Sequence, residues 1–143
     1  MHVASILNSK GRNVEAVGPE TTLKDVVEKL TTKRIGAVIV SATKDDLAGI
    51  VSERDIVNAL ARHGPAILDR PITEVMTRDV VTCKENDSVD HVMAVMTERR
   101  FRHVPVIANN RVAGLVSIGD VVKHRLAQIE HEANAMRDYI ATA

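Results

Sequence analysis

The chain has 143 residues, enough for one compact domain with a sizeable core. Its 19 Lys and Arg residues balance its 19 Asp and Glu residues, and it has one Phe, one Tyr and no Trp, which disfavours nucleic acid and anionic membranes as partners. Because Cys83 is the single cysteine, an internal disulfide is excluded. No apolar run approaches the roughly 18 residues of a membrane helix and no signal-peptide pattern opens the chain, so we expect a cytoplasmic protein.

The first half of the chain predicts the element order β-α-β-β-α. A strand at 14–17 precedes a helix that Thr22 and Asp25 open as a capping box. The mostly apolar, β-branched run 35–40 predicts a strand that is covered on both sides. After a turn at 42–46 we expect a strand at 47–51 and then a helix from about 52 to 63, where Gly64 and Pro65 end it.

The second half repeats this order after a linker at 63–77. The pattern predicts a strand at 80–82, a helix from 88 to about 99, strands at 103–107 and 112–116, and a closing helix. Strands separated by helices favour an α/β sandwich.

The closing helix is unusually long, from about 118 to 140. Its apolar residues are spaced alternately by four and three positions, which is a heptad pattern: Val122, Leu126, Ile129, Ala133, Met136 and Ile140. Such a face needs a partner helix, and we expect a second copy of the chain to provide it, as a homodimer. The alternative is that the helix folds back on its own domain.

A seven-residue pattern occurs once in each half. Gly49-Ile-Val-Ser-Glu-Arg-Asp recurs 65 residues later as Gly114-Leu-Val-Ser-Ile-Gly-Asp. A period of this length is longer than a solenoid repeat and indicates two similar half-domains packed against each other. A ligand site between such halves is then expected in two copies.

The repeated Ser-x-x-Asp at a strand end can be interpreted in two ways. The structural interpretation is a capping box, with the serine as N-cap and the aspartate three residues later. The functional interpretation is a nucleotide site. Free N–H groups at the helix start attract phosphate, the carboxylate can accept two hydrogen bonds from a ribose diol, and Gly49 and Gly114 let the backbone approach a ligand.

Two β-α-β-β-α copies that each end in Gly-h-x-Ser-x-x-Asp resemble a tandem pair of CBS domains, a Bateman module. Val75-Met76-Thr77 and Arg102-His103-Val-Pro-Val106 are also typical of that family. The resemblance covers roughly residues 1–126, with the first repeat at 1–66, the second at 67–126 and a helical extension at 127–143. It implies an α/β fold in which the two repeats pack as a pseudo-twofold pair, as in stand-alone bacterial signal-transduction CBS proteins.

The resemblance also implies two clefts between the repeats. One would combine Ser117 and Asp120 with Lys10, Asn13, Glu15, Ile35 and Ala37. The other would combine Ser52 and Asp55 with Thr77, Asp79, Val81 and Phe101. In each cleft the Asp is expected on the ribose, the Ser near the phosphate and strand residues against adenine.

Basic residues make the two clefts unequal. Arg54 stands where the second copy has Gly119, and Arg102 and His103 occupy positions at which related modules hold phosphate. The structural alternatives are a solvated strand edge for Arg102 and a buried, hydrogen-bonded ring for His103.

The function that the resemblance implies is regulatory binding of an adenine nucleotide (AMP, ADP, ATP or NAD(H)) without catalysis or a metal. S-adenosylmethionine is another ligand of such modules. We expect a homodimer and an unidentified regulated protein as partners. The alternatives are a ligand-free assembly module and, less favoured, a regulatory fragment related to IMP dehydrogenase, whose (β/α)₈ barrel of roughly 250 residues this chain is too short to contain.

Overall fold

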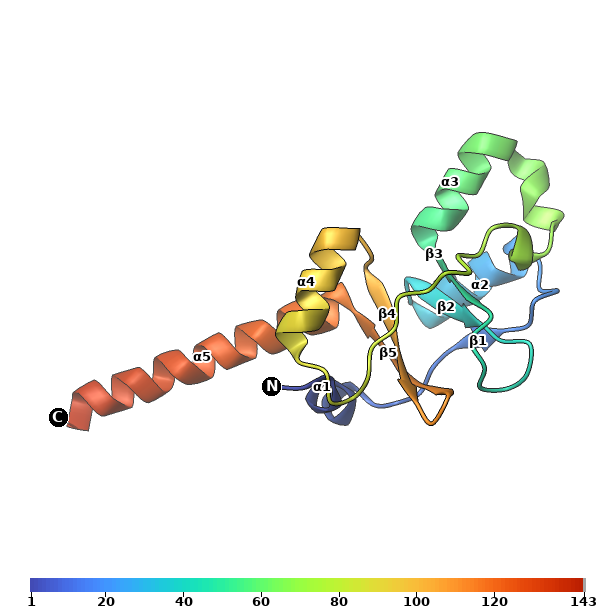
Figure 1. The fold of residues 1–143 in the computed structure, drawn as a ribbon. Coiled ribbons are helices and arrows are strands. Elements are labelled where there is room, and N and C mark those ends of the chain that lie inside the picture. The colour runs from blue at the N-terminus through green and yellow to red at the C-terminus, as the bar shows by residue number, and fades with distance from the viewer. Residues whose placement is uncertain (143) are drawn as a thin grey trace.

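The computed structural model describes residues 1–142 and forms two small α/β lobes with a long helix projecting from one of them (Figure 1). The elements of the first half are α1 (Val3–Lys10), β1 (Ala16–Val17), α2 (Leu23–Lys33), β2 (Ala37–Val40), β3 (Gly49–Ser52) and α3 (Glu53–His63). Two short 3₁₀ helices, η1 (Pro65–Asp69) and η2 (Ile72–Glu74), follow. The second half contains α4 (Val89–Arg99), β4 (His103–Ala108), β5 (Arg111–Ser117) and α5 (Ile118–Thr142).

The sheet of the first lobe has the order β1-β2-β3, with β1 and β2 parallel and β2 and β3 antiparallel. Every residue of β2 is buried, which confirms a strand covered on both faces. Val38 and Val40 pack with α2 and α3, whereas Ala37 and Ile39 face the second lobe and pack near Val112 and Leu115 of β5. The two repeats therefore share an apolar layer.

The second lobe contains the antiparallel pair β4-β5, but the expected strand at 80–82 does not form. Thr77 pairs with Ile50 of the first lobe, and Cys83 pairs with Val106 of the second. The residues between them cross from one lobe to the other, so they cannot continue either sheet. The expected strand at 14–17 is likewise reduced to Ala16–Val17.

The core of each repeat includes a segment that, in the sequence, comes just before the other repeat. Helix α1, which the sequence analysis missed, buries Val3, Ile6 and Leu7 in the core of the second lobe. The segment from η1 to Met76 packs in the core of the first lobe.

The glycines of the repeated motif admit these crossing segments. A Cβ on Gly114 would lie 2.7 Å from Leu7 Cδ2, and one on Gly49 would lie 2.7 Å from Met76 Sδ and 2.8 Å from the Thr77 carbonyl oxygen. These glycines therefore have a packing role, because parts of the chain itself occupy the space beside them. A ligand approach to their backbone stays a prediction.

Helix α5 leaves the second lobe and extends away from it (Figure 1). Val121 is fully buried near its start, but the apolar face that begins at Val122 remains exposed. The alternative that this helix folds back on its own domain is therefore wrong. Within residues 1–142, no helix combines the length and apolar character needed to cross a membrane.

Candidate functional site

The first Ser-x-x-Asp motif lies where β3 ends and α3 begins. The Ser52 N–H donates to Asp55 Oδ2 at 2.8 Å, and the Asp55 N–H donates to Ser52 Oγ at 3.3 Å, which makes a full capping box. The Ser52 hydroxyl also donates to Oδ2 at 3.1 Å. Within residues 1–142, no hydrogen bond reaches Asp55 Oδ1, so this oxygen can accept from a ligand hydroxyl while the cap persists.

A cavity of about 650 Å³ opens beside this motif, between the two lobes. The first lobe contributes Gly36, Ile50, Ser52, Glu53, Arg54, Asp55, Val57 and Asn58 to its lining, and the rest of the chain contributes Thr77, Arg100, Phe101, Arg102 and His103. A ligand here would touch both repeats at once.

The cleft combines basic and acidic side chains, with three arginines against Glu53 and Asp55. Arg54, Arg100 and Arg102 also line a smaller adjoining cavity of about 310 Å³. The Arg99 guanidinium lies 6.0 Å from the centroid of the Phe101 ring, at the limit of a cation–π contact. This distribution favours a ligand that carries negative charge next to an apolar group.

His103, at the start of β4, lines the cleft directly beside Gly36. A Cβ on Gly36 would lie 3.2 Å from both Cε1 and Nε2 of the imidazole. Burial lowers the pKa of His103, and the charges of Lys10 and Arg102 act in the same direction, while Glu53 and Asp120 oppose them. The surroundings therefore favour the neutral ring over the imidazolium.

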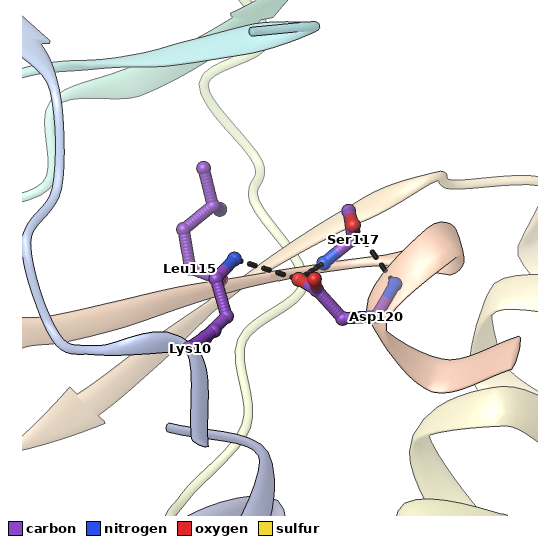
Figure 2. A network of polar contacts seen from close by, with 4 residues as sticks. All are labelled: Lys10, Leu115, Ser117 and Asp120. Atoms are coloured by element: carbon purple, nitrogen blue, oxygen red, sulfur yellow. Dashed lines mark hydrogen bonds and ion pairs between the residues drawn. The ribbon is translucent and has the colours of Figure 1, made fainter. Parts of the chain in front are cut away.

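The second Ser-x-x-Asp motif differs, because its carboxylate is already paired with a cation (Figure 2). Lys10 Nζ donates to Asp120 Oδ2 at 2.6 Å and to the Leu115 carbonyl oxygen at 2.8 Å. The Ser117 N–H donates to the same Oδ2 at 2.9 Å, and the Asp120 N–H donates to Ser117 Oγ at 3.1 Å. Burial opposes ionisation of Asp120, but the hydrogen bonds from Lys10 and Ser117 outweigh it and lower its pKa.

Comparison with known proteins agrees with this arrangement of two repeats. The family described as "CBS domain" matches residues 3–62 and 72–127. The chain belongs to the CBS domain family. Its two matched segments make it a CBS pair, which confirms the resemblance found in the sequence.

Solved CBS structures share this fold over most of their length. A CBS-domain-containing protein of Agrobacterium tumefaciens is 44% identical, with a TM-score of 0.85 over 87% of this chain and 99% of that one. A CBS domain protein of Pyrobaculum aerophilum, complexed with AMP, is 25% identical, with a TM-score of 0.73 over 84% and 89% of the two chains. A CBS domain pair complexed with 5′-methylthioadenosine and S-adenosyl-L-methionine is 26% identical, with a TM-score of 0.79 over 90% and 98%.

The CBS pair brings together most residues that the sequence analysis assigned to the Ser52 cleft, together with the basic residues Arg54, Arg102 and His103, which it had assigned to neither cleft. Ser52, Arg54, Asp55, Thr77, Phe101, Arg102 and His103 line one cavity, whereas Asp79 and Val81 lie outside its lining. Arg100 was missed as a site residue although it belongs to the basic run 99–102. Val57 and Asn58 were also missed, and their position one helical turn after the motif is the signal that would have found them.

The residues assigned to the other cleft are less well assembled. Lys10 reaches Asp120, but Glu15 lies 3.3 Å from Lys29 and 3.9 Å from Lys33. Ala37 is buried in the layer between the repeats, Ile35 packs against the core of the first lobe, and Asn13 is exposed. These residues have structural contacts of their own, and a ligand role for them stays a prediction.

Proposed function

We propose that this CBS pair is a regulatory module that binds an adenine nucleotide in the cleft between Asp55 and Arg102. The observation that carries the proposal is the lining of that cleft. It combines an aspartate with a free carboxylate oxygen, three arginines and the apolar side chains of Ile50, Val57 and Phe101. These groups match the ribose, phosphate and base of a nucleotide.

The residues divide the ligand between them according to their chemistry. Asp55 Oδ1 would accept from the ribose hydroxyls, while Arg54, Arg102 and Arg100 would bind phosphate oxygens through charge-assisted hydrogen bonds. Ser52 lies at the helix start, beside the phosphate, and Phe101 offers an aromatic face to adenine.

The related structures support an adenosine ligand, since one is bound to AMP and another to 5′-methylthioadenosine and S-adenosyl-L-methionine. The excess of arginine over carboxylate in this cleft favours the phosphate-bearing members of that group, because a sulfonium ligand brings positive charge of its own. We therefore propose AMP, ADP, ATP or NAD(H) as the ligand class.

Regulation would follow from binding linkage and requires no catalysis or metal. A ligand that touches Asp55 of one repeat and Arg102 of the other favours one relative orientation of the repeats. A regulated protein that binds one of these orientations more tightly then gains or loses affinity for the module when the nucleotide binds. We also propose that the module works in the cytoplasm as a homodimer, since α5 exposes an apolar face.

Calorimetric titration with AMP, ATP, NADH and S-adenosylmethionine tests the proposal, with Asp55→Ala as the variant and Asp120→Ala as its matched control. Both substitutions remove the acid of a capping box, and Asp120→Ala also removes the ion pair with Lys10, so the free energy of unfolding of each variant is measured beside its affinity. We expect nucleotide affinity to fall tenfold or more with Asp55→Ala, through loss of a charged hydrogen bond. Asp120→Ala should retain it. Equal loss in both variants would contradict the assignment to this cleft.

A ligand-free assembly module is the second candidate, because both aspartates already have a structural task in their capping boxes. For this candidate, no nucleotide would produce heat at millimolar concentration while the protein stays folded and associated.

A further inference from the structure

Helix α5 carries most of the apolar surface that this chain exposes. Of the eight large hydrophobic side chains that are exposed within residues 1–142, six lie on α5: Val122, Leu126, Ile129, Met136, Tyr139 and Ile140. The helix has 25 residues and is therefore about 37 Å long. An exposed apolar concentration of this kind marks an interaction surface.

The spacing of these residues defines a heptad register. Leu126, Ala133 and Ile140 take the a positions, and Val122, Ile129 and Met136 take the d positions. Charged residues flank this apolar line. Lys123, Glu130 and Arg137 occupy the e positions, and Arg125 and Glu132 occupy g positions. Because charged residues lie directly on both sides of it, the apolar line is narrow, as in a two-stranded coiled coil.

The flanking charges distinguish parallel from antiparallel pairing. In a parallel pair, each g position meets the following e position of the other helix. Arg125 then meets Glu130 of the partner subunit, and Glu132 meets Arg137 of the partner subunit. The twofold axis repeats both contacts, so all four are attractive.

Antiparallel pairing produces the opposite result. The apolar layers match when Leu126 faces Met136 of the partner subunit, but e positions then face e positions and g positions face g positions. Lys123 meets Arg137 of the partner subunit, and Glu130 and Glu132 each meet their own counterparts. Like charges therefore flank the helices, which destabilises this arrangement.

We propose that α5 pairs with α5 of a second copy as a parallel, in-register coiled coil. The inference does not depend on nucleotide binding. The side of the helix base that carries Val121 is already covered, since Val121 is buried. Arg125, at its g position, lies 3.7 Å from Asp90 in an exposed contact, which it would exchange for Glu130 of the partner subunit. The face of α5 that carries Ile118, Val122 and Leu126 is open to the partner. Both lobes of the chain lie at the N-terminal end of α5 (Figure 1). The parallel arrangement would therefore place the globular modules of both copies at the same end of the coiled coil.

Cysteine crosslinking of the full chain tests orientation directly. Val122→Cys and Ile140→Cys lie at opposite ends of the apolar face, and the native Cys83 is buried and serves as the background control. We expect each variant alone to form a disulfide-linked dimer under mild oxidation, while the unmodified chain does not. If neither variant crosslinks alone but a mixture of the two does, the pairing is antiparallel and the proposal is overturned.

Charge reversal tests the ion pairs. We expect Arg137→Glu to weaken the dimer about tenfold in sedimentation equilibrium, because it places a second carboxylate against Glu132 of the partner subunit. Adding Glu132→Arg to the same chain should restore affinity. Both residues are exposed, and no ion pair joins either of them to another residue within 1–142, so circular dichroism should be unchanged. A stronger dimer with Arg137→Glu indicates antiparallel pairing, and a mass of one chain or of more than two for the unmodified protein also overturns the proposal. Nucleotide titration of the dissociated variant reports separately on the cleft.

Discussion

Lys10 of the first repeat holds Asp120 of the second through a contact of 2.6 Å between Nζ and Oδ2 (Figure 2). Asp55 has no such cation, and its carboxylate is bonded to Ser52 alone within the described residues 1–142. Two copies of one motif are therefore in different electrostatic states. This asymmetry is the reason for assigning the nucleotide to one cleft.

The Lys10–Asp120 pair should make the stability of the protein depend on acid pH. The pKa of Asp120 is lowered in the folded chain, so its contribution is present above the ordinary value near 4 and is lost as pH falls through the folded pKa. We expect Lys10→Met to reduce the free energy of unfolding at neutral pH by less than about 1 kcal/mol, because water reaches the ammonium. In urea unfolding series, this difference should disappear in strong acid. A difference that is independent of pH would show that Lys10 acts through packing alone.

Substitution at Gly49 should destabilise the first repeat. A Cβ there would lie 2.8 Å from the backbone oxygen of Thr77, which cannot move without disturbing the Ile50–Thr77 pairing. We expect Gly49→Ala to cost roughly 1–3 kcal/mol in chemical denaturation. Gly114→Ala should destabilise the second repeat as well, since its Cβ would lie 2.7 Å from Cδ2 of Leu7, which is fully buried in the core and has no room to turn aside.

Gly18→Ala is the matched control for these glycines. A Cβ on Gly18 would come no closer than 3.9 Å to Thr21 Oγ1. Its stability should be unchanged or slightly higher, because alanine restricts the unfolded chain. An equal loss of unfolding free energy in Gly18→Ala and Gly49→Ala would contradict the steric explanation.

Most of the fold could be predicted from local signals. Ser52 and Ser88 act as N-caps and Gly64 follows the end of α3, so the bounds of α3 and α4 differ by at most one residue from those expected. Helix α1 was missed although Val3, Ile6 and Leu7 have helical spacing. The helix has only eight residues and is stabilised by packing against the second repeat, which lies far away in sequence.

The candidate site was predictable only in part. The motif places Ser52 and Asp55 together by sequence alone, because they are three residues apart at a helix start. The family resemblance then supplied Thr77, Phe101, Arg102 and His103 from the other repeat. The ion pair between Lys10 and Asp120 depends on the final side-chain geometry, which no local pattern specifies.

Cys83 should be unreactive in the folded protein. Burial raises the pKa of its thiol to about 12, and the charge of Asp87 adds to this effect. Near pH 8 its thiolate fraction is then on the order of a thousandfold below that of an exposed cysteine. We expect slow reaction with an aromatic disulfide reagent in buffer and rapid reaction in guanidinium chloride. Rapid reaction of the native protein would show that the crossing segment at Cys83 opens readily.

His103 should lower the stability of the ligand-free protein as pH falls. The unfolded chain takes up a proton on this residue near pH 6.5, whereas the folded chain does so only at lower pH. Between those values the unfolded state binds more protons, and stability decreases. We expect the thermal unfolding midpoint of His103→Gln to fall less between about pH 7 and pH 5 than that of the unmodified protein. His131→Gln, at an exposed position on α5, is the control and should follow the unmodified protein.

Nucleotide binding should show the opposite pH dependence. A phosphate beside His103 favours the charged imidazolium, which burial disfavours in the free protein, so binding at neutral pH should take up a proton. Affinity should then rise as pH falls from about 8 toward 6. Calorimetry in two buffers of different ionisation enthalpy measures the proton uptake, and comparison with His103→Gln separates it from protonation of the ligand phosphate itself. If the variant takes up as many protons as the unmodified protein, His103 does not contact the phosphate, and the anionic end of the ligand lies toward Arg54 and Arg100 instead.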